Sequence, residues 1–317
     1  MAKRGCTNHS FIIGINKPKG PSSHDVVNRL RGFTGERRCG HTGTLDPLAS
    51  GVMLLCAGPA TRLEPYIVSQ DKTYTFDIAF GSCTSTGDTQ GEVLQTSQHE
   101  DFLSDSQFAN STLNNFTGKM SQVPPAYSAI KIGGKTSYKL AREGKSTALA
   151  PRDIEVKSIS LVNIEPYGRS VLWRVKACVS KGTYIRSLAQ DIASSIGCCA
   201  HVSFLHRNSN GFLDEKMCVN LDDLHEICID DILKYALDPV QMLNIAHIEL
   251  SDEDMAKVSN GNKLCVSLLP STYTSGNIGV TYAGRLQAIY ALDSHVNALT
   301  CNARFSIGVI RGENRIL

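Results

Sequence analysis

The chain has 317 residues, of which 42% are hydrophobic and 20% are charged, and its formal net charge at neutral pH is +2. This composition is typical of a compact globular protein and excludes a fibre or a wholly disordered chain. Lys3 and Arg4 precede only a short apolar patch at 11–15, and no apolar run approaches membrane-spanning length. We therefore expect a cytoplasmic protein without membrane contact.

Segments with the patterns of regular structure follow one another from residue 11 onward. β-Branched and apolar runs predict strands at 11–16, 52–57, 73–80, 154–164 and 171–179, and helical spacing predicts helices at 23–33 and 183–196. Strands and helices are mixed without regular alternation. This order favours an α+β fold over a doubly wound parallel sheet.

The last hundred residues change in character twice. Residues 214–254 are acidic but carry spaced apolar residues such as Leu221 and Leu224, which predict helices with charged outer faces. After about residue 245 the pattern becomes one of short strands, with 278–282 and 286–292 joined as a hairpin. We expect a large domain over 1–244 and a small one over 245–317.

The small net charge conceals an uneven distribution. Lysine and arginine minus aspartate and glutamate gives +8 for residues 1–213, −10 for 214–254 and +4 for 255–317. The basic residues gather in two clusters: Arg29, Arg31, Arg37 and Arg38, then Lys119, Lys131, Lys135, Lys139, Arg142 and Lys145. Clusters of this kind fit the neutralisation of nucleic-acid phosphates.

The second cluster has a structural alternative, because Lys135, Lys139 and Arg142 have the spacing of one solvated helix face. Tyr127 and Tyr138 lie within the same stretch, and aromatic rings beside cations favour a grip on folded RNA. RNA binding is therefore the favoured interpretation of this stretch.

Eleven cysteines are present, an odd number, and Cys198 and Cys199 are adjacent. Both facts disfavour a disulfide framework. No CxxC pair occurs, and Cys198 with His201 supplies at most two of the four ligands that a structural zinc site needs. We expect reduced packing cysteines and no metal.

The stretch 40–51 reads GHTGTLDPLASG and contains a single carboxylate, Asp46, among small and turn-forming residues. Glycines and a proline at this density predict a tight loop that a flat ligand can approach closely. Asp followed by Pro is also a common helix start, with Asp as N-cap. Only 47–50 could form that helix before the apolar run at 52–56, so a dedicated cap has little to stabilise. Asp46 is a candidate nucleophile.

The string GHTGTLDPLASG resembles the catalytic loop of the TruB family of tRNA pseudouridine synthases, in which GHxGxLDPxAxG carries the one essential aspartate. Further blocks of the sequence look like family blocks in family order: 14–23 (GINKPKGPSS), 71–74 (DKTY), 124–144 (PPAYSAIKIGGKTSYKLAREG) and 180–186 (SKGTYIR). The resemblance covers most of residues 11–213.

The resemblance implies a central, mixed and largely antiparallel sheet with flanking helices and an active-site cleft across it. It also implies an RNA-clasping insertion at about 119–150 and a small C-terminal PUA-like β-barrel domain that binds RNA. The expected substrate is the T stem-loop of tRNA. We expect a monomer with no obligatory protein partner.

The implied reaction isomerises the T-loop uridine at position 55 of tRNA to pseudouridine. The C1′–N1 bond breaks, the uracil turns over, and C5 joins C1′, so no cofactor is required. A carboxylate can attack the sugar, attack the base, or take the C2′ proton so that a glycal forms. The sequence leaves all three routes open.

Arg186 matches the family arginine that pairs with the catalytic aspartate, and a guanidinium there would keep Asp46 ionised and aimed. Without the resemblance, an exposed arginine on a helix is the commoner case. Tyr74 and Leu205 match a tyrosine and a leucine that lie against the flipped uracil. Their alternatives are ordinary core positions in strands.

The remaining candidates contact RNA by resemblance or by chemistry. His41 matches a histidine that wedges into the RNA where the base had been, and its alternative is a loop histidine hydrogen-bonded to backbone. Lys17 and Lys19 are expected to bind phosphate. Tyr184 and Lys131 lie in family blocks and are assigned to substrate binding by position.

Two positions depart from the family pattern, His206 where arginine is frequent and Ser137 where leucine is frequent. Three hypotheses about function follow: a stand-alone tRNA synthase, the catalytic subunit of a guide-RNA particle, and a non-catalytic tRNA-binding or folding factor. The clasping insertion favours the first, because guide-dependent relatives generally lack it. The set of Asp46, Tyr74 and Arg186 argues against the third as the only role.

Overall fold

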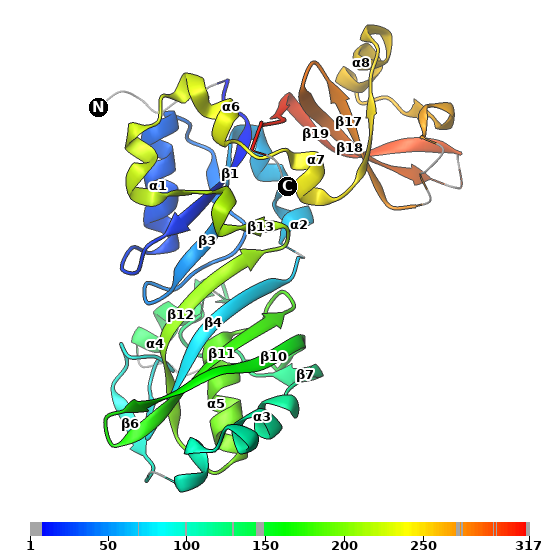
Figure 1. Ribbon diagram of the computed structural model, residues 1–317. Helices are drawn as coiled ribbons and strands as arrows, with labels where there is room; N and C mark the ends of the chain where they lie inside the picture. Colours follow the sequence, from blue (N-terminus) through cyan, green and yellow to red (C-terminus); the bar gives the residue numbers. More distant parts are fainter. Residues whose placement is uncertain are drawn as a thin grey trace. The chain divides into compact units, whose positions relative to one another are not determined.

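A computed structural model describes residues 8–314 except 69, 99, 129, 144–148, 271–272, 274, 294 and 296 (Figure 1). The chain forms two compact units, each built from separate stretches of sequence. The first contains Met1–Pro47, Gly51–Ser69 and Ser209–Leu317, and the second contains Leu48–Ser50 and Gln70–Asn208. Among the described residues, every helix is too short or too polar to cross a bilayer.

The first unit is organised around β1 (Phe11–Lys17), whose apolar residues are fully buried. β1 pairs antiparallel with β3 (Ser50–Ala57) and parallel with β14 (Cys218–Asn220), and β2 (Cys39–His41) pairs with the other edge of β3. Both predicted strands, 11–16 and 52–57, are confirmed. Near-continuous apolar runs form strands here because both of their faces are covered.

Helix α1 (Ser23–Thr34) follows β1 and matches the helix predicted at 23–33. A capping box fixes its start: the Asp25 N–H donates to the Ser22 hydroxyl, and the Ser22 N–H donates to the Asp25 carboxylate. Gly35, at φ +67°, ends the helix in the left-handed conformation that glycine adopts without strain. The chain is thereby directed towards β2 and the loop that contains Asp46.

The acidic stretch 214–254 differs from the predicted helices. It forms a series of single turns and short segments: β13 (Leu213–Asp214), η3 (Glu215–Met217), η4 (Leu221–Glu226), η5 (Ile229–Asp231), α6 (Ile232–Tyr235), α7 (Pro239–Leu243) and β15 (Ala246–Glu249). Leu221 and Leu224 are buried as the spacing predicts, whereas Leu233 is exposed. Asn220 and Asp238 begin new turns at short intervals, so no long helix can form.

The C-terminal residues of the first unit form a five-stranded sheet in the order β15, β17, β18, β19, β16. Its remaining members and neighbours are η6 (Val266–Leu268), α8 (Asp252–Ser259), β16 (Leu264–Cys265), β17 (Asn277–Tyr282), β18 (Arg285–Asp293) and β19 (Ala298–Ile310). The predicted hairpin is confirmed in β17 and β18. Its loop is Ala283 and Gly284, both at positive φ, as a tight hairpin requires.

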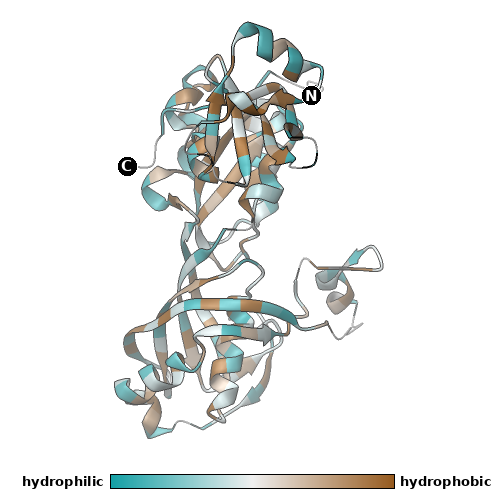
Figure 2. Cartoon of the chain, turned by 90° about the vertical axis from the view of Figure 1, so that its right-hand side faces the viewer, coloured by the Kyte–Doolittle hydropathy of each residue, from teal (hydrophilic) through white to brown (hydrophobic). Residues whose placement is uncertain are grey.

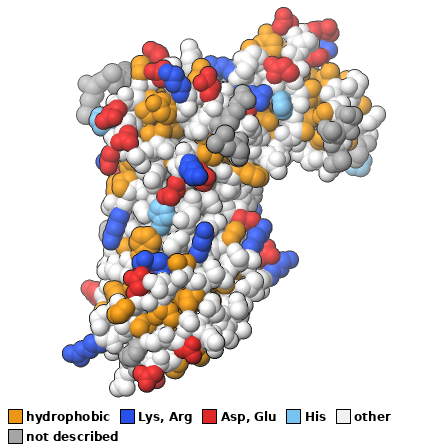
Figure 3. All heavy atoms as spheres, viewed as in Figure 1, with side chains coloured by type: hydrophobic (Ala, Val, Ile, Leu, Met, Phe, Trp, Pro, Cys, Tyr) orange, Lys and Arg blue, Asp and Glu red, His pale blue; other side chains and the backbone are white. Residues whose placement is uncertain are grey.

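Helix α8 carries Asp252, Glu253 and Asp254 in its first turn, and Ser251 caps it by accepting from the Asp254 N–H. Negative charge is favourable at a helix N-terminus, where backbone N–H groups point outward. Figure 3 shows these acidic side chains gathered over α8. The end of the acidic stretch 214–254 therefore forms the first turn of a helix and is not an acidic tail.

One hydrophobic core joins the C-terminal sheet to the strands at the beginning of the chain. Its buried members come from β1, β3, η1 (Gly58–Leu63), α2 (Glu64–Ile67), β13, η3, the segment before α7, α7, β18 and β19: Ile12, Val52, Leu54, Cys56, Ala60, Leu63, Ile67, Leu213, Met217, Leu237, Val240, Met242, Leu286, Ile289, Ala303, Phe305 and Val309. This core contains residues from both sides of residue 244. The domain division predicted there stays a prediction.

Hydrogen bonds near the C-terminus close the same unit. The Ile310 N–H donates to the Ser10 carbonyl over 2.8 Å, and Arg311 makes a two-pronged ion pair with the buried Asp238. Gly312 lies so close to Ala236 that an added Cβ would meet its carbonyl oxygen at 1.9 Å. The last strand is therefore fastened to the first.

The second unit is built on a sheet in the order β12, β4, β11, β10, β7. Its strands are β4 (Lys72–Phe80), β7 (Gly118–Gln122), β10 (Arg152–Tyr167), β11 (Ser170–Val179) and β12 (Ala200–Asn210). The β4–β11, β11–β10 and β10–β7 pairs are antiparallel. Strands predicted at 73–80, 154–164 and 171–179 are confirmed, and Figure 2 shows hydrophobic residues concentrated in the strands.

Helices and smaller hairpins complete the second unit. Helix α5 (Ile185–Ser195) matches the helix predicted at 183–196. The other elements are β5 (Ser82–Thr84), β6 (Val93–Thr96), η2 (Asp101–Ser104), α3 (Ser106–Asn114), β8 (Lys131–Ile132), β9 (Lys135–Thr136) and α4 (Ser137–Arg142). Trp173 is fully buried and donates to the Leu103 carbonyl, which fixes η2 against one sheet face. The fold class is α+β, as predicted.

Candidate active site

The loop that carries Asp46 is fastened on both sides of that residue. The Ser23 hydroxyl donates to the Leu45 carbonyl and accepts from the Leu45 N–H, both over 2.7 Å. The Gly20 N–H donates to the Pro47 carbonyl over 2.8 Å. The two sequence blocks 14–23 and 40–51 are therefore one structural element, in which the first block holds the backbone of the second.

Asp46 itself lies in irregular backbone, and Pro47 and Leu48 form a turn rather than a helix. The helix-capping alternative for Asp46 is therefore wrong. The Asp46 side chain is partly exposed, while its neighbour Leu45 is buried. A carboxylate on a loop pinned by backbone hydrogen bonds is available to a ligand and has little freedom to move.

Lys17 has an inward position that the sequence did not predict. Its side chain is fully buried, and its ammonium donates to the carbonyls of Pro18 and Pro21 over 2.9 and 2.8 Å. The ammonium thus stabilises the loop that presents Gly20 and Ser23. This arrangement favours a positioning role over the expected phosphate contact, whereas Lys19 is exposed and its phosphate contact stays a prediction.

His41 ends β2 and is partly exposed. Its Nδ1 accepts a hydrogen bond from the Gly43 N–H over 3.3 Å, which is the backbone-bound arrangement considered as the alternative. Thr42, beside it, is buried, and its N–H donates to the Leu54 carbonyl. The ring is held at the start of the Asp46 loop, and its role as a wedge in RNA stays a prediction.

In the second unit, Arg186 is 5% exposed in the first turn of α5, so the surface-arginine alternative is wrong. Its guanidinium donates to the carbonyls of Thr86 and Tyr127 over 2.6 and 2.9 Å. The carboxylate of the buried Asp88 lies 3.8 Å from the same guanidinium. A planar, five-donor group can satisfy several acceptors at once, and lysine cannot reproduce that geometry.

The start of α5 is also bound to β7, the strand at the beginning of the predicted insertion. The Tyr184 N–H donates to Gln122 Oε1 over 2.8 Å, and Gln122 Nε2 donates back to the Tyr184 carbonyl. The Ser187 hydroxyl donates to the Val123 carbonyl. The block 180–186 and the beginning of the insertion at 119–150 therefore form one connected structure.

The insertion contains the hairpin β8–β9 and helix α4. The hairpin turns through Gly133 and Gly134, both at positive φ, which matches the glycine pair seen in the sequence. Tyr127 and Tyr138 pack edge to face with ring centroids 6.0 Å apart. Lys131 begins β8, but its side chain lies outside the described residues, and its contact with substrate stays a prediction.

Tyr74 lies in β4 with 8% of its side chain exposed, on the same face as Phe76 and Ile78. This is the core-strand position considered as the alternative, and it leaves only an edge of the ring accessible. Leu205 is buried on the neighbouring strand β12. Contact of Tyr74 and Leu205 with uracil stays a prediction. The small exposed part of the Tyr74 ring is compatible with such a contact.

Lys72 and Arg207 are buried charged residues beside the candidate site that the sequence analysis did not single out. Both are buried, and each shares the strand face of a predicted residue two positions away, Tyr74 and Leu205. Burial lowers the pKa of Lys72 to about 8, and the charge of Arg207 acts in the same direction. The period of two in DKTY could have indicated Lys72, because it places the lysine on the buried face.

Asp46 and Arg186 belong to different units, so their pairing stays a prediction. Within the second unit, Ser50 Oγ and His206 Nδ1 lie 2.8 Å apart. His206 is the position where arginine is frequent in the family pattern. An imidazole ring here makes a hydrogen bond that a guanidinium would satisfy differently.

The described residues contain no group of three or more His, Cys, Asp or Glu side chains arranged to hold a metal ion. The described cysteines are free thiols, and burial raises the pKa of several of them, with Cys56 at about 12. His201 has a backbone partner, since its Nδ1 lies 3.0 Å from the Ser82 carbonyl. The buried thiols of Cys39, Cys56, Cys198 and Cys199 are packing residues, whereas Cys228 and Cys265 are exposed.

Two family models match adjacent parts of the chain. One, described as the N-terminal domain of the TruB family pseudouridylate synthase, matches residues 31–185. The other, described as the tRNA pseudouridylate synthase B C-terminal domain, matches residues 186–243. Together they include the loop of Asp46 and the start of α5.

Several relatives with the name tRNA pseudouridine synthase B are similar over most of their length. The protein of Rhodopseudomonas palustris is 35% identical over 288 residues, which are 89% of this chain and 77% of the relative. That of Pelotomaculum thermopropionicum is 37% identical over 291 residues, 86% of this chain and 91% of the relative.

The fold is shared with solved structures at lower identity. A chain in the structure described as a Cbf5–Nop10–Gar1 complex aligns with a TM-score of 0.66 and 23% identity, over 94% of this chain and 84% of that chain. This likeness concerns the fold alone. It agrees with a mixed α+β architecture and with a curled C-terminal sheet of the PUA type.

Proposed function

The chain belongs to the TruB family of pseudouridylate synthases, and from this premise we propose that it isomerises the T-loop uridine of tRNA, at position 55, to pseudouridine with Asp46 as the catalytic carboxylate. The family makes the chain an isomerase. Relatives named tRNA pseudouridine synthase B support tRNA as the substrate. The choice of nucleotide and the role of Asp46 rest on the arguments below.

The observation that carries the proposal is the fixation of the Asp46 loop. Ser23 holds the residue before Asp46 and Gly20 holds the residue after it, while the Asp46 side chain stays partly exposed. A catalytic carboxylate must meet the reacting atoms in one orientation, and a fixed backbone supplies that orientation before the substrate binds. Structural loops seldom need a partly exposed charge at their most constrained point.

The reaction needs a carboxylate that is ionised and aimed, and a site that holds an extruded base. Asp46 would attack the nucleoside or take its C2′ proton; the C1′–N1 bond breaks, the uracil turns over, and C5 bonds to C1′. The C5 proton is released and N1 gains a proton, so no oxidant or cofactor enters. Tyr74 and Leu205 would lie against the base during this rotation, as the family resemblance implies.

Arg186 would stabilise the ionised form of Asp46 in the bound state. The guanidinium is buried and is already held by two carbonyls. A buried cation attracts a carboxylate more strongly than an exposed one, because little solvent screens the pair. Lys72 and Arg207 add further positive charge on the face of Tyr74, where the backbone phosphate or a carbonyl oxygen of uracil would be favoured.

The insertion supports a stand-alone enzyme rather than a subunit of a guide-RNA particle, and we expect that enzyme to act in the cytoplasm. Its basic residues and its paired tyrosines, Tyr127 and Tyr138, suit contacts with folded RNA. Its start is bound to α5 next to Arg186. Binding energy from the grip would therefore reach the residues proposed for chemistry.

The test uses the purified chain alone with an unmodified tRNA transcript. We expect pseudouridine at the T-loop uridine and at no other uridine, without added metal, guide RNA or protein. Activity that appears only when a guide RNA and accessory proteins are supplied would identify a particle subunit instead. Tight tRNA binding without any pseudouridine would identify a binding or folding factor.

A further inference from the structure

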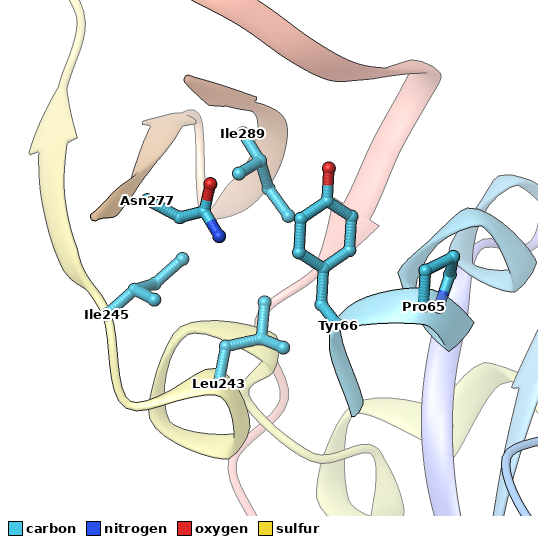
Figure 4. A pocket seen from close by; sticks show the side chains of 6 residues that line it. All are labelled: Pro65, Tyr66, Leu243, Ile245, Asn277 and Ile289. Atoms are coloured by element: carbon cyan, nitrogen blue, oxygen red, sulfur yellow. The ribbon is translucent and has the colours of Figure 1, made fainter. Parts of the chain in front are cut away.

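A cavity of about 230 Å³ lies within the first unit, between α2 and the C-terminal sheet. Its lining comes from three stretches of the chain and consists of Pro65, Tyr66, Leu243, Ile245, Asn277 and Ile289. Figure 4 shows the side chains of Leu243, Ile245 and Asn277 converging with Tyr66 on one space. None of these residues belongs to the site proposed for uridine isomerisation.

The walls of this cavity suit a flat, largely apolar ring. Leu243 and Ile245 pack against the main core, and Ile289 is fully buried. Tyr66 contributes a half-buried ring, and burial raises the pKa of its phenol, so the ring is uncharged at neutral pH. The volume is below the range of about 300–1,000 Å³ that holds drug-sized ligands, and a single heterocycle is a better match.

Asn277 supplies a polar group with a defined direction. Its side-chain oxygen accepts a hydrogen bond from the Asn302 amide over 3.1 Å, which fixes the plane of the Asn277 amide. Within the described part of the chain, no residue accepts from the Asn277 amide nitrogen. Its two N–H donors are thus available for the edge of a base, which carries ring nitrogen and carbonyl acceptors.

The surroundings of the cavity carry positive charge. Arg62 precedes Tyr66 by four residues, and its guanidinium counteracts the rise in the pKa of the Tyr66 phenol, so the two groups are close. Arg62 also donates to the carbonyl of Arg304, and both arginine side chains are exposed. Glu64, exposed on α2, is the opposing charge on the same segment. The Arg304 guanidinium donates to the Ser259 carbonyl and lines a different pocket, so Arg62 is the cation beside Tyr66 that would contact a phosphate.

We propose that this cavity binds one unpaired base of the RNA substrate, in addition to the uridine that is isomerised. The base would lie against Tyr66, its polar edge would accept from Asn277, and its phosphate would lie near Arg62. Arginine, an aromatic ring and an amide are the groups that recognise splayed bases in single-stranded RNA. The choice of RNA as the ligand rests on the proposed function.

The test compares Asn277→Asp with Asn262→Asp in the full chain bound to unmodified tRNA transcript. Both changes convert an amide to a carboxylate in the same C-terminal sheet region, and Asn262 is exposed outside the cavity. Watson–Crick edges are probed with dimethyl sulfate and carbodiimide. We expect one unpaired base outside the T-loop uridine that wild type and Asn262→Asp protect and Asn277→Asp leaves reactive, with about tenfold weaker binding.

Identical protection patterns and affinities within twofold for all three proteins would overturn the proposal. The finding that a protein side chain, and not a base, occupies the cavity would overturn it as well. If Asn277→Asp lowers the melting temperature, Ile245→Phe tests instead whether the cavity binds the base. This change narrows the cavity without changing its charge. Pseudouridine is measured in the same samples. A wild type that protects the base but forms no pseudouridine would refute the proposed function and leave the cavity assignment intact.

Discussion

The guanidinium of Arg186 donates a 2.9 Å hydrogen bond to the backbone carbonyl of Tyr127. The first residue is proposed to orient the catalytic carboxylate, and the second lies in the insertion proposed to grip RNA. A shift of the insertion therefore changes the acceptors around Arg186. On these proposed roles, binding and chemistry share this contact, and we expect mutations in the insertion to alter turnover as well as affinity.

Arg186→Lys is expected to lower both stability and activity. An ammonium cannot reach the carbonyls of Thr86 and Tyr127 together, so a buried acceptor loses its donor at a cost of about 1–3 kcal/mol. Chemical denaturation measures the loss, and pseudouridine formation under single-turnover conditions measures the rate. Arg169→Lys, at an exposed turn, should change neither. Equal behaviour of the two variants would remove Arg186 from the site.

Asp46→Asn is expected to abolish the reaction while tRNA affinity stays within about tenfold, roughly 1.4 kcal/mol. The amide keeps the shape of the side chain but cannot act as nucleophile or base. Release of tritium from C5-labelled uridine in the T arm measures turnover. Asp153→Asn changes an exposed residue of β10 and is the matched control. Tritium release at the wild-type rate by the Asp46 variant would falsify the mechanism.

Ser23→Ala and Ser22→Ala separate positioning of the loop from helix stability. Ser23 holds both backbone groups of Leu45, so its loss leaves a buried N–H and C=O without partners and should slow turnover more than it weakens binding. Ser22 caps α1, and its loss should cost about 1 kcal/mol of stability with turnover unchanged. Unfolding curves and single-turnover rates distinguish the two. The same effect on turnover in both variants would contradict the positioning role of Ser23.

Lys72→Met is expected to change the pH dependence of stability. The pKa of Lys72 is about 8 in the folded protein and about 10.4 in an unfolded chain. Between these values the unfolded state binds more protons, so the lysine makes wild-type stability rise with pH. From about pH 7 to about pH 10.5, the free energy of unfolding of wild type should gain about 3 kcal/mol relative to the variant. Parallel curves for the two proteins would show that Lys72 has an ordinary pKa.

Local patterns in the sequence were sufficient for most of the elements. The runs at 11–16 and 73–80 form β1 and β4, and the hairpin at 278–292 turns through Ala283 and Gly284. Each depends on contacts between near neighbours or on a period that one buried face imposes. The prediction of helices over 214–254 was wrong in detail. Apolar residues of this stretch are buried against distant strands and do not line one continuous helix.

Candidate site residues could be named from the sequence where one residue type would carry the chemistry, but their surroundings could not be predicted where a distant partner decides them. Asp46 could be identified from its loop, whereas the inward turn of Lys17 depends on two proline carbonyls that no spacing reveals. Arg186 was assigned by resemblance, and its two backbone acceptors lie 100 and 59 residues away in the chain. Burial of Lys72 likewise requires β12 beside β4.

The fastening of Ile310, Arg311 and Gly312 to β1 and its neighbours has a consequence for biosynthesis. The unit that carries Asp46 needs strands from both ends of the sequence, so it cannot close while a ribosome still holds residues near 310. The second unit consists of the continuous stretch Gln70–Asn208 and the three residues Leu48–Ser50, so it can fold earlier. A nascent chain should therefore acquire its scaffold for Arg186 well before the loop that carries Asp46 is locked in place.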